Sequence, residues 1–334
     1  MKESLQYSIN CIAPLLPMKW LIQVSGAHTV LPLYHTISDT DLPHLKHLYP
    51  VLSRKTFENQ LDYLVEHYEP ADYKLLLADK LPSDNRFVLS FDDGLRQFYD
   101  VAAPILIKKG IPAICFVNTG FIDNKAMFYR MKTSLLIEHL LHHSNKSLHD
   151  EVRNRCANQG INYQYPNDLK KITDSDQTLI TELGEITGID FNQYLADHQP
   201  YMSSEELIQL RRQGFAIGAH SVTHPYYPLL SEDEQLTETL TSVREIKEKF
   251  NMEDGLFSFP YTDFKIRKSF FEAIKNEVKL SFGTANLKND CIPTNFQRIP
   301  MEMFGQNDPE LLIKSQYLLH IVKKWSGKST IERN

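Results

Sequence analysis

The chain has 334 residues, carries a formal net charge of −6, and is 42% hydrophobic and 23% charged. This length is enough for one large domain or two ordinary ones, and the composition is that of a soluble globular protein. The negative charge, without any basic stripe, argues against nucleic acid as the main partner. The four cysteines, Cys11, Cys115, Cys156 and Cys291, include no C-x-x-C pair, and we interpret them as reduced thiols.

The N-terminal stretch is moderately apolar but does not have the pattern of a signal peptide. Glu3, Pro14, Pro17 and Lys19 interrupt the apolar run, and no small-residue cleavage site follows it. No run in the chain reaches the ~20 apolar residues that a membrane-spanning helix needs. We therefore expect a cytoplasmic protein. Residues 9–24 either pack on the domain or associate with a membrane surface.

The predicted elements alternate between helices and strands along most of the chain. Apolar residues recur at helical spacing from Phe57 to Tyr68 and predict a helix over 53–68. Further helices are predicted over 95–110, 204–213, 231–250 and 265–276. Strands are predicted over 86–91, 112–118, 215–219, 256–259 and 278–283. This alternation predicts a mainly parallel sheet covered by helices, either open or closed into a barrel.

Residues 122–200 interrupt this alternation. The segment is polar, rich in Asn, Gln, His and Asp, and mostly helical in pattern. We interpret it as an insertion in a loop, so that residues 1–121 and 201–334 form a single discontinuous domain.

Polar residues follow three of the predicted strands, at the point where each strand ends. Asp92, Asp93 and Gly94 follow the first, a run from His220 to Pro225 follows the second, and a run from Pro260 to Asp263 follows the third. The carboxyl ends of parallel strands form one face of a sheet, so these residues are expected to converge in space.

Two imidazoles and one carboxylate are a common way to hold a catalytic divalent metal with an open position. His220 and His224, four residues apart, could supply the imidazoles. One of the two adjacent carboxylates could be the third ligand and the other a base. His139 and His143 have the same spacing but no strand end beside them, and we interpret that pair as part of a solvated or packed helix face.

These residues resemble the motifs of a known family. Residues 91–94 (Phe-Asp-Asp-Gly), 220–225 (His-Ser-x-x-His-Pro) and 259–261 (Phe-Pro-Tyr) are similar to the first three motifs of the polysaccharide deacetylases, the NodB-homology or carbohydrate esterase family four. Residues 30–39 and 111–122 also resemble strands of that family. The resemblance implies a distorted, incomplete (β/α) barrel and a divalent metal, most often Zn²⁺.

The resemblance also implies roles for individual residues. Asp93, His220 and His224 would hold the metal, and Asp92 would be the general base. The backbone N–H of Tyr261 would stabilise the oxyanion, with Pro260 and Tyr261 contacting the substrate. Ser221 would support the histidine loop.

The chain departs from the family pattern in three places. No arginine precedes Pro260 to orient the base, and Arg298 is a candidate replacement. The fourth motif, an Asp with a nearby Trp, is not recognisable. The general acid of the fifth motif has two candidates: His320, which reads as part of a C-terminal helix, and His35, which follows a strand-like run. Tyr34 and Asn118 are further candidates for lining the pocket.

The expected function is that of a metal-dependent deacetylase, hydrolysing the N-acetyl group of an amino sugar in a polysaccharide, oligosaccharide or glycan precursor. One alternative is a de-O-acetylase or another amide hydrolase that uses the same metal site. The other is a catalytically impaired glycan-binding or envelope-assembly protein, an alternative that the unassigned general acid motivates.

Overall fold

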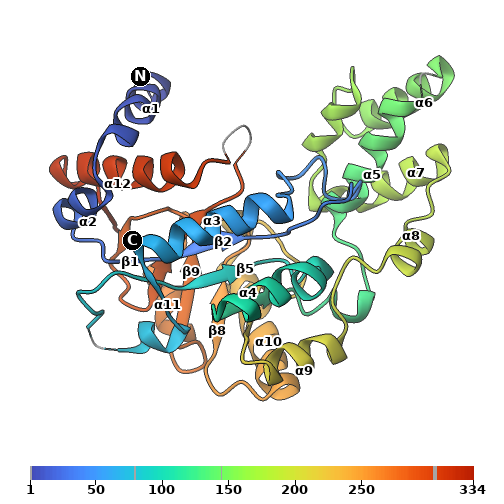
Figure 1. The fold of residues 1–334 in the computed structure, drawn as a ribbon. Coiled ribbons are helices and arrows are strands. Elements are labelled where there is room, and N and C mark those ends of the chain that lie inside the picture. Colours follow the sequence, from blue (N-terminus) through green and yellow to red (C-terminus); the bar gives the residue numbers. More distant parts are fainter. Residues whose placement is uncertain (1, 79, 144, 304–306) are drawn as a thin grey trace.

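The computed structural model describes residues 2–78, 80–143, 145–303 and 307–334. At its centre lies a sheet of eight parallel strands: β2 (Pro32–Tyr34), β5 (Leu89–Phe91), β6 (Ala113–Val117), β7 (Ala216–Ala219), β8 (Leu256–Ser258), β9 (Leu280–Gly283), β11 (Asn295–Gln297) and β12 (Ile299–Pro300). The strand order is β11-β9-β8-β7-β6-β5-β2-β12. The sheet is nearly closed into a barrel with helices outside (Figure 1), which confirms the predicted fold class.

One short segment pairs with both edges of this sheet. β11 pairs with β9 and β12 pairs with β2. Only Arg298 separates β11 from β12, so the chain itself bridges the two edges. The backbone N–H of Arg298 donates to the carbonyl of Gly283 at 3.1 Å, and the next N–H, of Ile299, donates to the carbonyl of Leu31 at 2.8 Å. Arg298 therefore occupies the position at which the segment changes partner.

The predicted helices cover the outside of the sheet (Figure 1). They are α3 (Arg54–His67), η3 (Phe98–Ala102, a π-helical turn) running into α4 (Ala103–Lys109), α9 (Ser204–Arg212), α10 (Glu232–Phe250) and α11 (Lys268–Ile274). Capping boxes at Ser203 and Ser231 start α9 and α10. Short 3-10 turns occur at η2 (Tyr73–Leu77), η4 (Ile122–Asn124) and η7 (Tyr227–Leu229).

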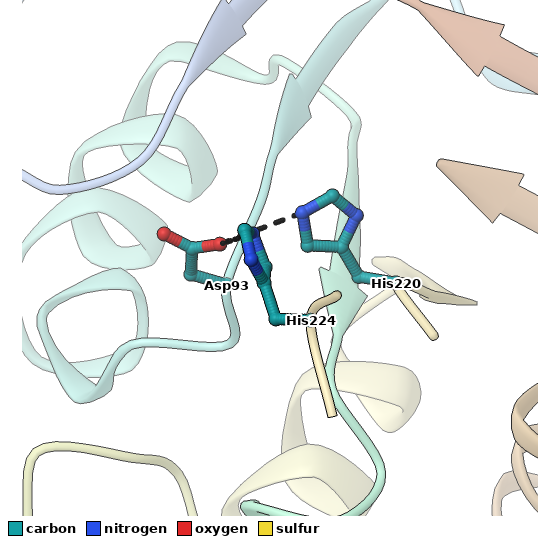
Figure 2. Close-up of side chains that lie close together, drawn as sticks. All are labelled: Asp93, His220 and His224. Carbon is teal, nitrogen blue, oxygen red and sulfur yellow. Dashed lines mark ion pairs between the residues drawn. The ribbon is translucent and has the colours of Figure 1, made fainter. Parts of the chain in front are cut away.

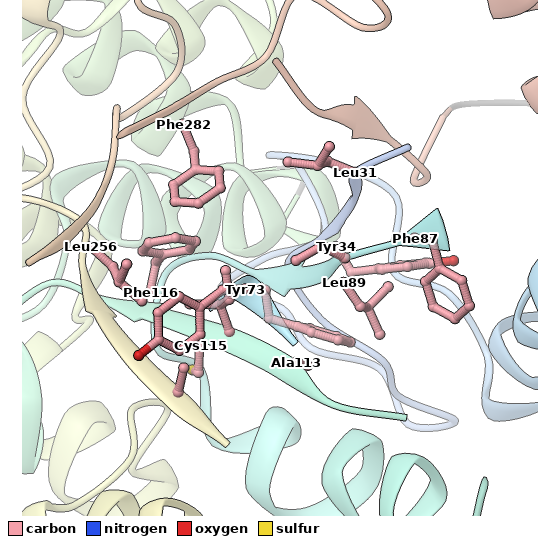
Figure 3. Close-up of a cluster of buried hydrophobic side chains, with 14 of the residues drawn as sticks. Leu31, Tyr34, Tyr73, Phe87, Leu89, Ala113, Cys115, Phe116, Leu256 and Phe282 are labelled. Atoms are coloured by element: carbon pink, nitrogen blue, oxygen red, sulfur yellow. The ribbon is translucent and has the colours of Figure 1, made fainter. Parts of the chain in front are cut away.

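Apolar side chains from the strands and helices form the main core. Leu89, Phe116, Leu256 and Phe282 come from four different strands and are all buried (Figure 3). The ring centroids of Phe116 and Phe282 lie 5.1 Å apart. Because parallel strands are covered on both faces, they consist of nearly continuous apolar runs.

The two ends of the described chain lie on one side of the barrel (Figure 1). There α1 (Lys2–Ile12), η1 (Ala13–Leu15) and α2 (Met18–Ser25) pack against α12 (Pro309–Trp325). Two minor parallel sheets join β1 (Thr29–Val30), β4 (Arg86–Phe87) and β3 (Glu69–Pro70), and β10 (Asn289–Asp290) with β13 (Thr330–Ile331). None of the helices among the described residues has the length and apolar character needed to cross a membrane.

Residues 122–200 build a helical unit beside the barrel (Figure 1). It contains α5 (Tyr129–His142), α6 (Lys146–Asn158), η5 (Pro166–Lys171), η6 (Asp174–Asp176), α7 (Gln177–Thr187) and α8 (Phe191–His198), with an apolar core of its own. Its two ends meet, because Asn124 and Tyr201 exchange hydrogen bonds of 3.0 Å. This exchange supports our proposal that the segment is an insertion in one discontinuous domain.

The loop after β2, residues 35–52, reaches from the barrel to this helical unit. The Ser134 hydroxyl donates to the carbonyl of Pro43 at 2.6 Å, and His47 lies 2.8 Å from the Glu138 carboxylate. Leu45 is buried in the core of the helical unit. The loop and the unit therefore form one continuous wall above the carboxyl ends of the strands.

Candidate active site

Three side chains from two strand ends form a compact cluster. Asp93 follows β5, and His220 and His224 follow β7. One ligand atom from each of the three lies within 4.8 Å of the others. The Asp93 Oδ1 atom is 3.5 Å from Nε2 of His220 and 3.3 Å from Nε2 of His224 (Figure 2). The ring centroids of His139, in α5, and His143, just after it, lie 3.9 Å apart in a stacked arrangement outside this cluster.

The backbone at these strand ends is left-handed at several non-glycine residues. The φ angles are 73° at Asp93, 66° at Ser221, 60° at His224 and 58° at Tyr261. Such conformations cost about 1 kcal/mol or more each and persist where surrounding contacts determine them. One such contact is the hydrogen bond of 3.0 Å from the N–H of His224 to the Ser221 hydroxyl.

Gly94 is required by both conformation and space. Its φ is 67°, and a Cβ there would come within 2.9 Å of the Val117 side chain. The turn can therefore run directly against β6 and leave the preceding Asp93 facing the histidines.

The two imidazoles turn their Nε2 atoms toward Asp93. Nδ1–H of His220 donates to the carbonyl of Ser258 at 2.8 Å, so in the neutral ring Nε2 is the nitrogen with the free lone pair. Oδ1 of Asp93 and Nδ1 of His224 are buried atoms without a hydrogen-bond partner among the described residues. A carboxylate oxygen left unpaired beside two imidazole nitrogens suits a divalent cation, so these residues fit the metal that the motifs imply.

Asp92 lies beside this cluster and is held by a buried arginine. Arg298 donates to both carboxylate oxygens at 2.7 Å, and the Ser258 hydroxyl donates to one of them at 3.1 Å. Burial is the largest influence and by itself would raise the pKa of Asp92, but the charge and hydrogen bonds of Arg298, together with His220 and His35, outweigh it and hold that pKa below its usual value. Asp92 is therefore an oriented, ionised carboxylate, 3.9 Å from Nε2 of His220.

His35 lines the same pocket and is paired with the buried Glu302. Nδ1–H of His35 donates to Glu302 at 2.5 Å, and the other Glu302 oxygen accepts the backbone N–H groups of His35 and Thr36 at 2.8 and 2.9 Å. Burial lowers the pKa of His35, but the charge and hydrogen bond of Glu302, together with the charges of Asp93 and Asp92, more than offset this and raise it to about 9. The His35 ring stacks on Tyr49, whose hydroxyl donates to Asp93 at 3.1 Å.

Sequence reasoning missed Glu302 and Tyr49. Glu302 comes just after β12, so it is a further polar residue at a strand end and could have been found by that rule. Tyr49 lies in the long loop between β2 and α3, and no local pattern distinguishes it.

These groups open into a cavity of about 450 Å³. The barrel supplies Asp92, Asp93, the two histidines and Tyr261, and the loop after β2 supplies His35 and residues 47–49. Residues of the helical unit, including Phe128, Arg130, Ile137 and Lys170, form the facing wall. The volume falls within the range of about 300–1,000 Å³ that is usual for small-molecule sites.

Tyr261, after β8, lies next to the histidines. Its ring centroid is 4.7 Å from that of His224, and its backbone N–H has no acceptor among the described residues. Pro260 is buried and does not line the cavity, which differs from the expectation that it contacts the substrate.

Two other expected pocket residues lie behind the site. The Asn118 side chain donates to the carbonyl of His220, so it braces the histidine loop from behind β6 instead of lining the cavity. Tyr34 is buried and donates to Gln60 at 2.9 Å.

His320, the other candidate acid, is not brought to the site. It is buried in α12 and borders a separate small hollow with Leu319 and Lys323. This hollow shares no residue with the cavity of the metal-binding cluster.

Asp263 lies in a buried ionic cluster behind the loop that follows β8. It pairs with Arg333, and Nη1 of Arg333 also donates to the carbonyls of Asp263 and Ile266 at 3.0 and 3.2 Å. Arg333 also pairs with Asp290. Asp263 thus anchors the loop two residues beyond Tyr261 and has no place in the cavity.

Several solved structures have a similar fold. The Streptococcus pyogenes deacetylase PplD in complex with acetate is 17% identical and matches over 86% of this chain and 97% of its own, with a TM-score of 0.54. IcaB from Ammonifex degensii is 16% identical and matches over 87% of this chain and 97% of its own, with a TM-score of 0.53. A polysaccharide deacetylase from Bacillus cereus is 12% identical and matches over 86% of this chain and 68% of its own, also with a TM-score of 0.53.

No curated protein matches the sequence significantly. The sequence model described as "Polysaccharide deacetylase" matches residues 79–276, which is more than half of the chain and contains Asp92, Asp93, both histidines and Tyr261. The chain therefore belongs to the polysaccharide deacetylase family, and it is a hydrolase of carbon–nitrogen bonds other than peptide bonds.

Proposed function

We propose that the protein is a metal-dependent deacetylase that removes the N-acetyl group from an amino sugar in a polysaccharide, oligosaccharide or glycan precursor. The observation that carries this proposal is the meeting of Asp93, His220 and His224 with an arginine-bound Asp92 in one cavity. A divalent ion, which we propose is Zn²⁺, would be held by the first three residues. When bound, it supplies Lewis acidity and lowers the pKa of water.

The chain's own groups account for the proton transfers. Asp92, ionised and fixed by Arg298, accepts the proton of the attacking water. The unpaired backbone N–H of Tyr261 donates to the acyl oxygen as negative charge develops on it, a contribution typically worth about 3 kcal/mol.

His35 is our candidate for the general acid. Its pKa of about 9 keeps the imidazolium protonated at neutral pH, and Glu302 fixes the ring. The protonated ring can then deliver a proton to the departing amine nitrogen. A complete set of base, acid and oxyanion donor favours an active enzyme over a binding protein that has lost its acid.

The test is acetate release from N-acetylglucosamine oligomers by the Zn²⁺-loaded protein. The acetate complex of the streptococcal deacetylase holds the product that this reaction would form. Release that is abolished by a chelator and restored by Zn²⁺ would support the proposal. Metal binding at one equivalent without acetate release from any N-acetyl sugar tested would contradict it. Parallel assays with O-acetylated sugars distinguish an esterase that uses the same residues.

The location of the protein is a separate proposal. All four cysteines are free thiols and two of them are exposed, which supports a reducing compartment and thus the cytoplasm. Leu15, Tyr7 and Trp20 expose 80%, 74% and 43% of their surface on the N-terminal helices, and such side chains suit the surface of a membrane. Sedimentation of the native protein with lipid vesicles tests this contact, and its loss in a Leu15→Ser/Trp20→Ser variant is the expected result.

A further inference from the structure

The helical unit contributes an unpaired cation to the cavity. Arg130 lies in the first turn of α5, is half-buried, and donates from Nε to the Tyr261 hydroxyl at 2.9 Å. Its guanidinium lies 5.2 Å from the ring centroid of Tyr129 and 5.6 Å from that of Tyr261. Among the described residues, no carboxylate lies within 4.0 Å of this guanidinium. The Arg130 guanidinium is thus held in place by two aromatic rings, and no carboxylate neutralises its charge.

Lys170, in η5, adds a second positive charge beside the first. Its backbone carbonyl accepts from Nη1 of Arg130 at 3.4 Å, and Lys170 is one of the residues that border the same cavity. The nearby Asp168 is engaged by Lys171 at 2.8 Å, and Lys170 has no acidic partner in the described part of the chain. Two elements of the helical unit therefore place uncompensated cations at one end of the cavity.

The carboxylates of the cavity do not balance these cations. Asp92 is paired with Arg298, Glu302 with His35, and Asp93 faces His220 and His224. The positive charges of Arg130 and Lys170 therefore remain uncompensated, although the chain as a whole carries a formal net charge of −6. A cavity with this local charge attracts an anion and binds it by charge-assisted hydrogen bonds.

Arg130 lies close to the metal-binding cluster, and the backbone of Lys170 contacts Arg130. Tyr261 stands between Arg130 and the metal-binding histidines, since its hydroxyl accepts a hydrogen bond from Arg130 and its ring centroid lies 4.7 Å from that of His224. One aromatic side chain therefore separates the cationic end of the cavity from the metal-binding cluster. A ligand that spans this distance needs its negative charge on the same sugar as the acyl group or on a neighbouring one.

We propose that the substrate is an acylated amino sugar that also carries a phosphate or carboxylate group, and that Arg130 and Lys170 bind this anion. This inference rests on the proposed deacetylase function and narrows its substrate class. Neutral N-acetyl sugars lack a group for this end of the cavity, so they are the weaker ligands.

Binding without turnover tests the inference directly. The Zn²⁺-loaded Asp92→Asn protein is titrated in a calorimeter with N-acetylglucosamine, N-acetylglucosamine 1-phosphate and N-acetylmuramic acid. We expect at least one anionic sugar to bind about tenfold or more tightly than the neutral one, and the difference to shrink as salt screens the contact. The two anionic ligands distinguish phosphate from carboxylate.

The same titration is repeated in Arg130→Met and Lys170→Met backgrounds, with Lys132→Met as the matched control. Lys132 is a cation of the same helix as Arg130 but lies over the Phe191 ring, away from the cavity. The preference for the anion should fall about tenfold in the first two variants and persist in the control. Lys170 is exposed, so its variant tests the inference even if Arg130→Met does not fold.

Equal affinity for the neutral and anionic sugars, or a preference that survives both substitutions, would overturn the inference. Acetate release from neutral oligomers alongside equal affinities would leave the proposed function standing and remove only the anion site. An anion preference in a wild-type protein that releases no acetate from any of these sugars would support the site and contradict the deacetylase.

Discussion

Replacing Arg298 by methionine should both destabilise the fold and disable the base. Arg298 is fully buried and supplies both hydrogen bonds that neutralise Asp92, which is 3% exposed. Removing one partner of a buried ion pair typically costs about 3–5 kcal/mol, because the other charge is left without compensation. For a chain of this size, that corresponds to a fall in Tm of roughly 4–7 °C.

A double-mutant cycle separates this charge effect from lost packing, because Arg298 also lies over the Phe116 and Phe282 rings at 5.4 and 5.9 Å. Urea unfolding is measured for Arg298→Met, Asp92→Asn and the double variant, all at the same Zn²⁺ concentration. If the pair is what matters, the double variant should be no less stable than Arg298→Met, since the orphaned charge has gone. If instead the loss of stability in the double variant equals the sum of the losses in the two single variants to within about 0.5 kcal/mol, the reasoning is refuted.

Three further predictions concern the site and its support. Asp92→Asn should retain Zn²⁺ by elemental analysis yet lose about 10²–10⁴-fold in acetate release, and retained turnover would remove Asp92 as the base. The His35 pKa of about 9 lies above its usual 6.5, so the Glu302 contact stabilises the fold fully below pH 6.5 and this stabilisation is lost as the pH rises through 9. Glu302→Gln should therefore shift the alkaline limb of the rate profile to lower pH, and an unmoved limb would exclude His35 as the acid. Arg333→Met should lower the free energy of unfolding by about 3 kcal/mol and also lower kcat, because the loop carrying Tyr261 loses its anchor; a stability loss with unchanged kcat would separate the anchor from catalysis.

Much of the fold followed from local pattern. Helices such as α3 and α10 have strong apolar periodicity and clear caps, so their bounds agree with the prediction to within about two residues. The parallel strands are short, but their apolar runs and the polar residues after them are distinct. Because parallel topology brings strand ends together, the clustering of Asp93 with His220 and His224 could be anticipated from sequence alone.

The contacts that complete the site depend on segments far apart in the chain. Glu302 reaches His35 across 267 residues, and no local pattern links the two. Tyr49 enters the cavity from an irregular loop, whose path is set by packing against the helical unit and not by propensity. Asn118 directly follows a strand, and the rule for polar residues at strand ends therefore placed it in the cavity. Its amide instead turns toward the histidine loop and donates to the carbonyl of His220.

The way the barrel closes has a consequence for biosynthesis. Arg298 lies 206 residues beyond Asp92, in the segment that joins both sheet edges. On the ribosome, every earlier strand emerges while this aspartate still lacks its counter-ion, and pairing at such sequence separation is intrinsically slow. Closure of the barrel and the pairing of Asp92, the proposed base, are thus one late event, so we expect a nascent chain to be inactive until its barrel is complete.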